Sequence, residues 1–245
     1  MVSIRPGRVT IGGVTLENHL LLAAGILGTT GASLSRMLTL GAGGVVTKSI
    51  GPVPKEGHAG PCLVVLEDGL LNAMGLPNPS KDFVDELLPL QKKPVVASIF
   101  GGTPEEFATV AGWFSGKVAG FELNLSCPHA SGYGMAMGQD PELVRQITAA
   151  VKAVVDIPVI PKLTPNTPNI AEIAAAAVAG GADGLCAINT VGPGYTSAHG
   201  HAVLSNGYGG ISGKGILPIG LKCVREIAAV TDVPIIGCGG VSSAD

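Results

Sequence analysis

Short apolar runs, each followed by a small or polar residue, alternate along the chain with segments of helical character. The runs contain few polar interruptions, so they predict strands that are buried on both faces. Seven such strands are expected, at residues 20–24, 44–48, 95–99, 120–125, 159–163, 184–189 and 233–237. Helices are expected between them, at residues 33–40, 104–114, 141–155, 170–180 and 217–230.

This alternation predicts an α/β fold in which helices cover a parallel sheet. Polar residues follow nearly every predicted strand, and in a (β/α)₈ TIM barrel those strand ends converge on one site. The barrel is therefore favoured over a doubly wound sheet. Residues 9–11 and 14–16, joined by Gly12 and Gly13, predict a small hairpin ahead of the first strand, plugging the bottom of the barrel. The chain stops just after the seventh strand, so we expect a single barrel domain over residues 1–245 that lacks its last βα unit.

Composition narrows the class of protein further. Only 13% of the 245 residues are charged and 46% are hydrophobic, which excludes a disordered chain. The net charge of −3 leaves no basic footprint for nucleic acid or an anionic membrane. No run approaches the roughly 20 apolar residues of a membrane span. Five scattered cysteines without a CxxC pair predict reduced thiols in a cytoplasm and no metal site.

Polar side chains at the ends of buried strands are the candidate ligand-binding residues. Burying an amide or an ammonium group is costly unless it binds something. Lys48 or Lys162 alone is as readily explained by a side chain that reaches the surface. Two lysines at corresponding strand ends, however, favour an anionic ligand. The candidates are Lys48, Ser98, Asn124, Lys162, Asn189 and Thr190.

A cysteine beyond a strand end indicates a catalytic role, and two glycine-rich turns indicate a phosphate-binding site. Cys127 follows a strand end and precedes a glycine-rich loop, where a thiol can act as a base or nucleophile. The other four cysteines are interpreted as small buried apolar residues, and His129 as a base or an orienting group. Glycine-rich turns at residues 209–213 and 237–240 are typical of backbone phosphate sites near the last barrel strands, and imply a mononucleotide.

Together these motifs resemble the class 1 dihydroorotate dehydrogenases, most closely the 1B branch and its archaeal members. The resemblance runs in the right order over nearly the whole chain. The motifs are TKS at 47–49, NAMGLPNP at 72–79, NLSCPH at 124–129, PKLTPN at 161–166, INT at 188–190, LSNGYGGISG at 204–213 and IIGCGG at 235–240.

The resemblance implies an FMN-dependent enzyme that oxidises (S)-dihydroorotate to orotate in pyrimidine biosynthesis. Cys127 would be the base that takes the C5 proton, while hydride from C6 passes to flavin N5. Lys48 would touch both ligands, and Lys162 would stabilise reduced flavin. The implied substrate-binding residues are Lys48, Asn72, Ala73, Met74, Gly75, Leu76, Asn124, Asn189 and Thr190. The implied FMN-binding residues are Ala24, Lys48, Ser49, Ser98, Asn124, Lys162, Ile188, Gly213, Gly239 and Gly240.

The resemblance also implies partners. Members of the 1B branch form homodimers and then a heterotetramer with an iron–sulfur and FAD subunit that passes electrons to NAD. The CPH sequence at 127–129 and GQDPELVR at 138–145 are similar to dihydropyrimidine dehydrogenases, so a uracil or thymine enzyme is the close alternative. Dihydropyrimidine dehydrogenases lack the NAMGLPNP segment, which favours orotate. A phosphate-binding barrel without redox chemistry is a third possibility.

Overall fold

A parallel seven-stranded sheet forms the centre of the computed structural model, which describes residues 7–125 and 137–243. The strand order is β15-β10-β9-β8-β7-β4-β3, so each predicted strand lies beside its neighbour in the chain. The strands are β3 (Leu21–Leu22), β4 (Gly44–Val46), β7 (Val95–Ile99), β8 (Gly120–Asn124), β9 (Val159–Leu163), β10 (Leu185–Ala187) and β15 (Ile235–Gly237). The seven predicted strands and their parallel order are confirmed.

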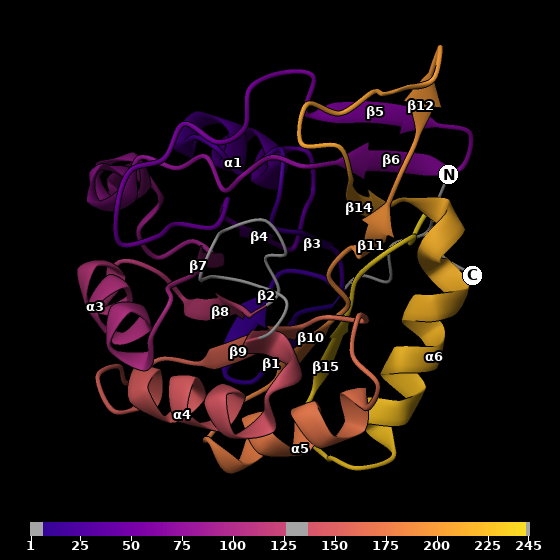
Figure 1. Cartoon of the computed structure of the whole chain (residues 1–245). Helices are drawn as coiled ribbons and strands as arrows, with labels where there is room; N and C mark the ends of the chain where they lie inside the picture. The colour runs from indigo at the N-terminus through magenta and orange to yellow at the C-terminus, as the bar shows by residue number, and fades with distance from the viewer. Residues whose placement is uncertain (1–6, 126–136, 244–245) are drawn as a thin grey trace.

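Helices follow the strands and pack around the outside of the sheet (Figure 1). They are α1 (Gly31–Thr39), α2 (Phe83–Leu87), α3 (Pro104–Phe114), α4 (Pro141–Lys152), α5 (Ile170–Ala179) and α6 (Leu217–Ala228). Helices α3 to α6 follow one another around the sheet, and each packs on the next. This order is typical of a (β/α) barrel. In the part of the chain that the structure describes, no helix has the length and apolar character needed to cross a membrane.

Local sequence explains where these helices begin. Thr103 caps α3, its hydroxyl accepting a hydrogen bond from the Glu106 amide, and Pro104 occupies the first turn. Asp140 caps α4 by accepting from the amides of Glu142 and Leu143. Both helices therefore begin at the predicted proline.

The cap of α4 gives a stability prediction. Asp140→Ala is expected to lower the free energy of unfolding by about 0.5–2 kcal/mol, because two amides of the first turn lose their acceptor. Urea unfolding measures the change, with Asp140→Asn as the control that keeps a capping acceptor. Equal losses in the two variants would contradict a capping role.

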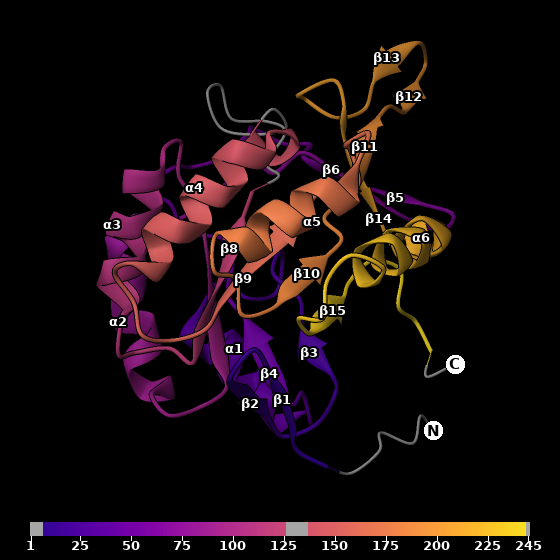
Figure 2. The same cartoon turned by 90° about the horizontal axis from the view of Figure 1, so that it is seen from below.

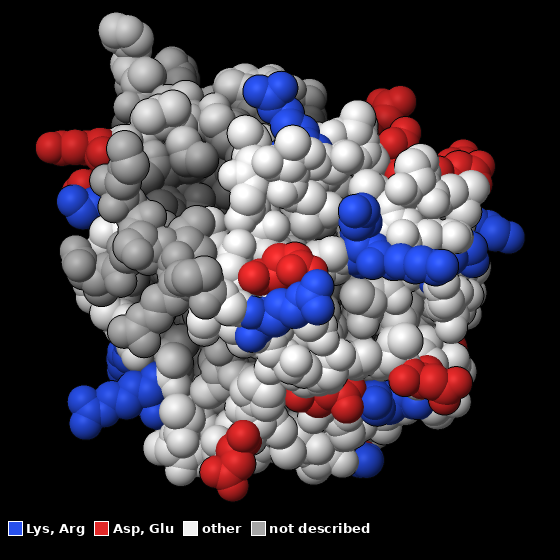
Figure 3. Space-filling model, turned by 180° about the vertical axis from the view of Figure 1, so that it is seen from behind, with Lys and Arg blue, Asp and Glu red and all other residues white. Residues whose placement is uncertain are grey.

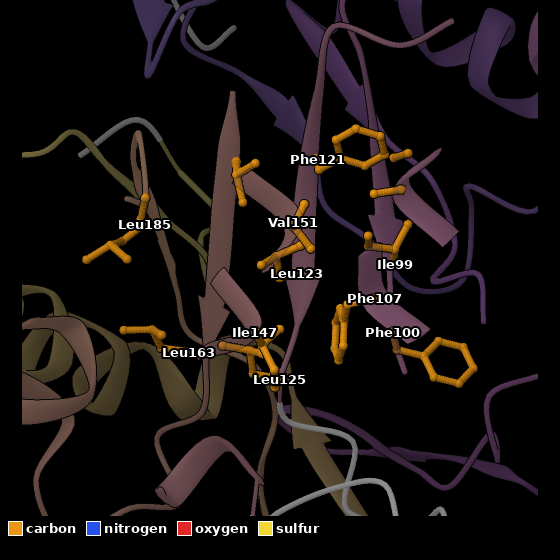
Figure 4. Close-up of a cluster of buried hydrophobic side chains, with 14 of the residues drawn as sticks. Ile99, Phe100, Phe107, Phe121, Leu123, Leu125, Ile147, Val151, Leu163 and Leu185 are labelled. Atoms are coloured by element: carbon orange, nitrogen blue, oxygen red, sulfur yellow. The ribbon is translucent and has the colours of Figure 1, made fainter. Parts of the chain in front are cut away.

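The largest hydrophobic core lies between the sheet and its helices. Phe121 and Leu123 of β8 and Ile99 of β7 meet Phe107 of α3 and Ile147 of α4 (Figure 4). All five side chains are fully buried. This packing explains why the strands read as continuous apolar runs, since both of their faces are covered.

A second core closes one end of the barrel. The hairpin of β1 (Val9–Ile11) and β2 (Val14–Leu16) has the predicted bounds, and Val14 and Leu16 pack on Val46, Val96 and Ile160 inside the sheet. Figure 2 shows this hairpin at the opposite end of the barrel from strands β11 to β13. The predicted plug is confirmed.

A second sheet was not predicted. It is antiparallel, with the order β11-β14-β6-β5, from β5 (Leu63–Leu66), β6 (Gly69–Asn72), β11 (Val191–Gly194) and β14 (Gly209–Ser212). A short hairpin of β12 (Ser197–Ala198) and β13 (His201–Ala202) projects beside it (Figure 1). Pairing Asn72 with Gly210 joins segments from two different βα loops.

One face of the molecule has dispersed surface charges. On the face shown in Figure 3, acidic and basic side chains lie interspersed among uncharged ones instead of gathering by sign. The described ion pairs include Lys222 with Glu226 and Arg145 with Glu142, both within exposed helix turns. Such pairs contribute little to stability.

Candidate active site

A cavity of about 520 Å³ lies at the carboxyl ends of the barrel strands. Asn124 is the last residue of β8, and Lys162 lies beside it in register on β9. Asn189 and Thr190 follow β10, and Lys48 follows β4. The predicted residues that line the cavity are Ala24, Lys48, Ser49, Asn72, Met74, Gly75, Leu76, Asn124, Lys162, Asn189 and Thr190. Residues from six separate chain segments are thus brought together as the barrel prediction requires.

A buried ion pair forms part of the wall of this cavity. The Lys162 ammonium is 3.7 Å from the Glu122 carboxylate, and both side chains are less than 10% exposed. Burial is the largest single influence and lowers the pKa of Lys162. The Glu122 carboxylate, together with Cys186 and Cys238, outweighs burial and raises the pKa above its ordinary value. Lys162 is therefore a fixed cation in the cavity wall. Glu122 was not singled out from the sequence, because its partner lies 40 positions away in the chain.

Hydrogen bonds join polar side chains that come from the ends of separate strands. The Asn189 side-chain Nδ2 donates to Asn124 Oδ1 over 3.2 Å, and Asn124 Nδ2 donates to Ser49 Oγ over 3.0 Å. The Thr190 amide donates to Asn189 Oδ1 over 2.7 Å. These bonds hold the side chains in one orientation toward the cavity, without the entropic cost of ordering them when a ligand binds.

The segment from Asn72 to Leu76 forms another wall. Asn72 ends β6 and its side chain donates to the Gly210 carbonyl over 3.3 Å. Gly75 has a φ of +74°, and a Cβ there would come within 2.6 Å of the His58 backbone nitrogen. Only glycine fits this close approach. Ala73 is fully buried and does not line the cavity.

A second hollow of about 420 Å³ adjoins the first and shares Glu122 and Lys162 with it. Its lining includes Gly239 and Gly240, which have φ values of +109° and +79°. A Cβ on Gly240 would lie 2.7 Å from the amide nitrogen of Leu217, so this turn packs directly on the first residue of α6. The amide-lined cavity thus continues to a glycine turn at a helix N-terminus, where anions bind favourably.

Three predicted FMN residues lie outside the lining of both hollows. Ser98 and Ile188 are buried, and the Ser98 hydroxyl is held between Ser49 and Glu122. Gly213, with a φ of +101°, packs against Gly69. Contact of these residues with a cofactor stays a prediction. Cys127 and His129 lie outside the described residues.

Two of the remaining cysteines differ from the expectation that they are buried apolar residues. Cys62 and Cys238 are only partly buried. Cys238 follows the edge strand β15 and lines the second hollow. A hydrogen bond from Cys186 lowers the pKa of the Cys238 thiol to about 6, with the Lys162 charge adding to it and burial opposing it. The same bond, and after it burial, raises the pKa of Cys186.

The fold and the site together define a class: a (β/α)-barrel enzyme with lysines and side-chain amides that line a polar cavity at the strand ends. Residues 7–245 match the family model described as dihydroorotate dehydrogenase. The chain belongs to the dihydroorotate dehydrogenase family, as the motif resemblance predicted.

Curated relatives from archaea share about half of their residues with the chain. Each of three is named dihydroorotate dehydrogenase B (NAD(+)), catalytic subunit. The protein of Methanocella arvoryzae is 55% identical over 236 residues, covering 95% of this chain and 78% of the relative. The protein of Methanosarcina mazei is 54% identical over 241 residues, covering 96% and 77%. That of Pyrococcus horikoshii is 50% identical over 241 residues, covering 96% and 78%.

Proposed function

We propose that the chain is the catalytic subunit of a dihydroorotate dehydrogenase B, which oxidises (S)-dihydroorotate to orotate in pyrimidine biosynthesis with NAD as the final electron acceptor. One observation carries the proposal. In a member of this family, two lysines and three asparagines from separate strands and loops line a single cavity. They are Lys48, Lys162, Asn72, Asn124 and Asn189.

The cavity suits the chemistry of orotate, a flat anion with a carboxylate and two ring carbonyls. Side-chain amides and a lysine ammonium are hydrogen-bond donors that match those oxygens. We assign substrate binding to Lys48, Asn124, Asn189, Thr190 and the segment from Asn72 to Leu76. Ala73 would contribute through its backbone position within that segment.

The residues present also fit FMN. The two adjoining hollows run from the amide-lined cavity past the Lys162 cation to the turn of Gly239 and Gly240 at the start of α6. The turn would hold the phosphate, and Lys162 would face the polar edge of the ring. When bound, FMN would accept the hydride that leaves C6 of the substrate. The other proposed FMN residues are Ala24, Lys48, Ser49, Ser98, Asn124, Ile188 and Gly213.

Proton removal requires a base, which we assign to Cys127. A thiol whose pKa lies near the working pH is an effective general base. The assignment depends on the NLSCPH motif at residues 124–129, because Cys127 lies outside the described residues.

The relatives' names describe a catalytic subunit of an NAD-linked enzyme. We propose that this chain likewise acts with a second subunit, carrying FAD and an iron–sulfur cluster, in a heterotetramer built on a homodimer of single FMN-binding barrel domains. The expected location is the cytoplasm, where the cysteines stay reduced.

An anaerobic visible spectrum of the purified chain with FMN, before and after dihydroorotate is added, tests the function. Immediate bleaching of the flavin band is the expected result. A bound flavin that is bleached by dihydrouracil or dihydrothymine but not by dihydroorotate would contradict the proposal and favour a dihydropyrimidine dehydrogenase. A colourless chain that binds a phosphosugar would place it among barrels without redox chemistry.

A further inference from the structure

Glu122 lies two residues before Asn124 on β8, so both side chains point to the same face of the strand, the barrel interior. Its register partner on β7 is Ser98. Glu122 is 3% exposed and Ser98 is fully buried, so water does not compete for their polar atoms. A buried carboxylate in this position is costly unless its oxygens have partners. None of the roles assigned above uses it.

We propose that Glu122 is a positioning residue, which orients the amide of Asn124 for the substrate through a one-way chain of hydrogen bonds. The inference rests on the proposed function, because it concerns the site assigned to orotate. The chain runs from Asn124 through Ser49 and Ser98 to the Glu122 carboxylate.

The direction of this chain follows from chemistry. An ionised carboxylate can only accept hydrogen bonds, so the Ser98 hydroxyl donates to Glu122 Oε1 over 3.1 Å. The single hydroxyl hydrogen of Ser98 is then already donated. The Ser49 hydroxyl must therefore donate to Ser98 over their 2.9 Å contact. Ser49 is left as an acceptor toward Asn124, whose Nδ2 donates to it over 3.0 Å.

This direction decides which end of the Asn124 amide faces which neighbour. Its NH₂ group points to Ser49, so its carbonyl oxygen faces Asn189, whose Nδ2 donates to it. An amide turned the other way would put two N–H groups against each other. Glu122 therefore sets the donor and acceptor pattern of Asn124, on its own strand, through the two serine hydroxyls. That pattern matches Asn189, whose Oδ1 accepts from the Thr190 amide.

The other carboxylate oxygen serves a different partner. Glu122 Oε2 faces the Lys162 ammonium at 3.7 Å, while Oε1 takes the Ser98 hydroxyl. Glutamine in this position can donate to Ser98, which permits the whole chain to reverse, and it also leaves Lys162 without a countercharge. Alanine at position 98 cuts the chain but leaves the ion pair in place.

Calorimetric titration of the full chain with orotate tests the inference. Glu122→Gln and Ser98→Ala are each expected to raise the orotate dissociation constant about tenfold, which corresponds to one mispaired hydrogen bond between Asn124 and the ligand. The double variant is expected to bind no more weakly than Glu122→Gln alone, because both substitutions break the same chain.

A second readout separates positioning from general damage. With FMN bound, Glu122→Gln is expected to shift the flavin midpoint potential more than Ser98→Ala does, since only the former alters the charge beside Lys162. Thr148→Val is the control: it removes a fully buried hydroxyl that bonds within α4, and orotate affinity should not change.

The outcomes are distinct. Wild-type orotate affinity in either single variant, or losses that add in the double variant, would overturn the positioning role and leave the proposed function standing. A wild-type chain that does not bind orotate at all would overturn both.

Discussion

The Cys127→Ser variant is expected to reduce FMN with dihydroorotate about 10²–10⁴-fold more slowly than the wild type near neutral pH, the range that general-base catalysis contributes. The deficit should shrink as the pH rises. A serine hydroxyl holds its proton far more tightly than a thiol, so it becomes a competent base only in alkaline solution. Anaerobic stopped-flow measurement of flavin absorbance across a pH series gives both quantities.

A matched substitution away from the cavity provides the control. Cys223→Ser alters a buried thiol on α6, and its flavin should be reduced at the wild-type rate. A Cys127→Ser deficit that is equal at neutral and high pH would show that the residue does not act as the base. Orotate affinity should remain close to the wild-type value, because the role proposed for the thiol is to remove a proton and not to bind the ring oxygens.

Lys162→Met is expected to lower the free energy of unfolding by about 3–5 kcal/mol, the cost of leaving one partner of a buried ion pair uncompensated. The substitution retains most of the side-chain volume but removes the cation that faces Glu122. Urea denaturation measures the loss.

The double variant Lys162→Met/Glu122→Gln should be close to wild-type stability, since it removes both charges together. Lys222→Met is the exposed control: its partner Glu226 lies on the helix surface, and the loss should be small compared with that of Lys162→Met. A similar loss for Lys162→Met and Lys222→Met would mean that the buried pair is not what holds this part of the barrel. The Lys162 variant should also bind FMN less tightly, because it lacks the cation that we propose faces the polar edge of the ring.

Much of the fold follows from local features of the sequence. The start of α3 at Pro104 and of α4 at Pro141 depends on the residue just before each proline, which caps the helix. The hairpin at residues 9–16 depends on its two glycines, both of which have positive φ. Continuous apolar runs such as Val95–Ile99 predict strands covered on both faces. In each case the deciding residues lie within a few positions of one another.

The second sheet shows where local features are insufficient. Leu63–Leu66 and Gly69–Asn72 flank the short turn at Glu67 and Asp68, a hairpin signal that the sequence does contain. Their place, however, depends on pairing Asn72 with Gly210, 138 positions further along the chain. Periodicity within either segment does not contain that information.

By itself, the sequence determined the barrel, the order of its strands, and the polar residues that follow them. Parallel strands put their carboxyl ends at one edge, so Lys48, Asn124 and Lys162 could be expected to meet. Only the tertiary structure decided which of these side chains touch and what lies beneath them. Glu122 reads as an ordinary strand residue until β7 and β9 enclose it, because hydrogen bonds and ion pairs between strands depend on register and not on position in the chain.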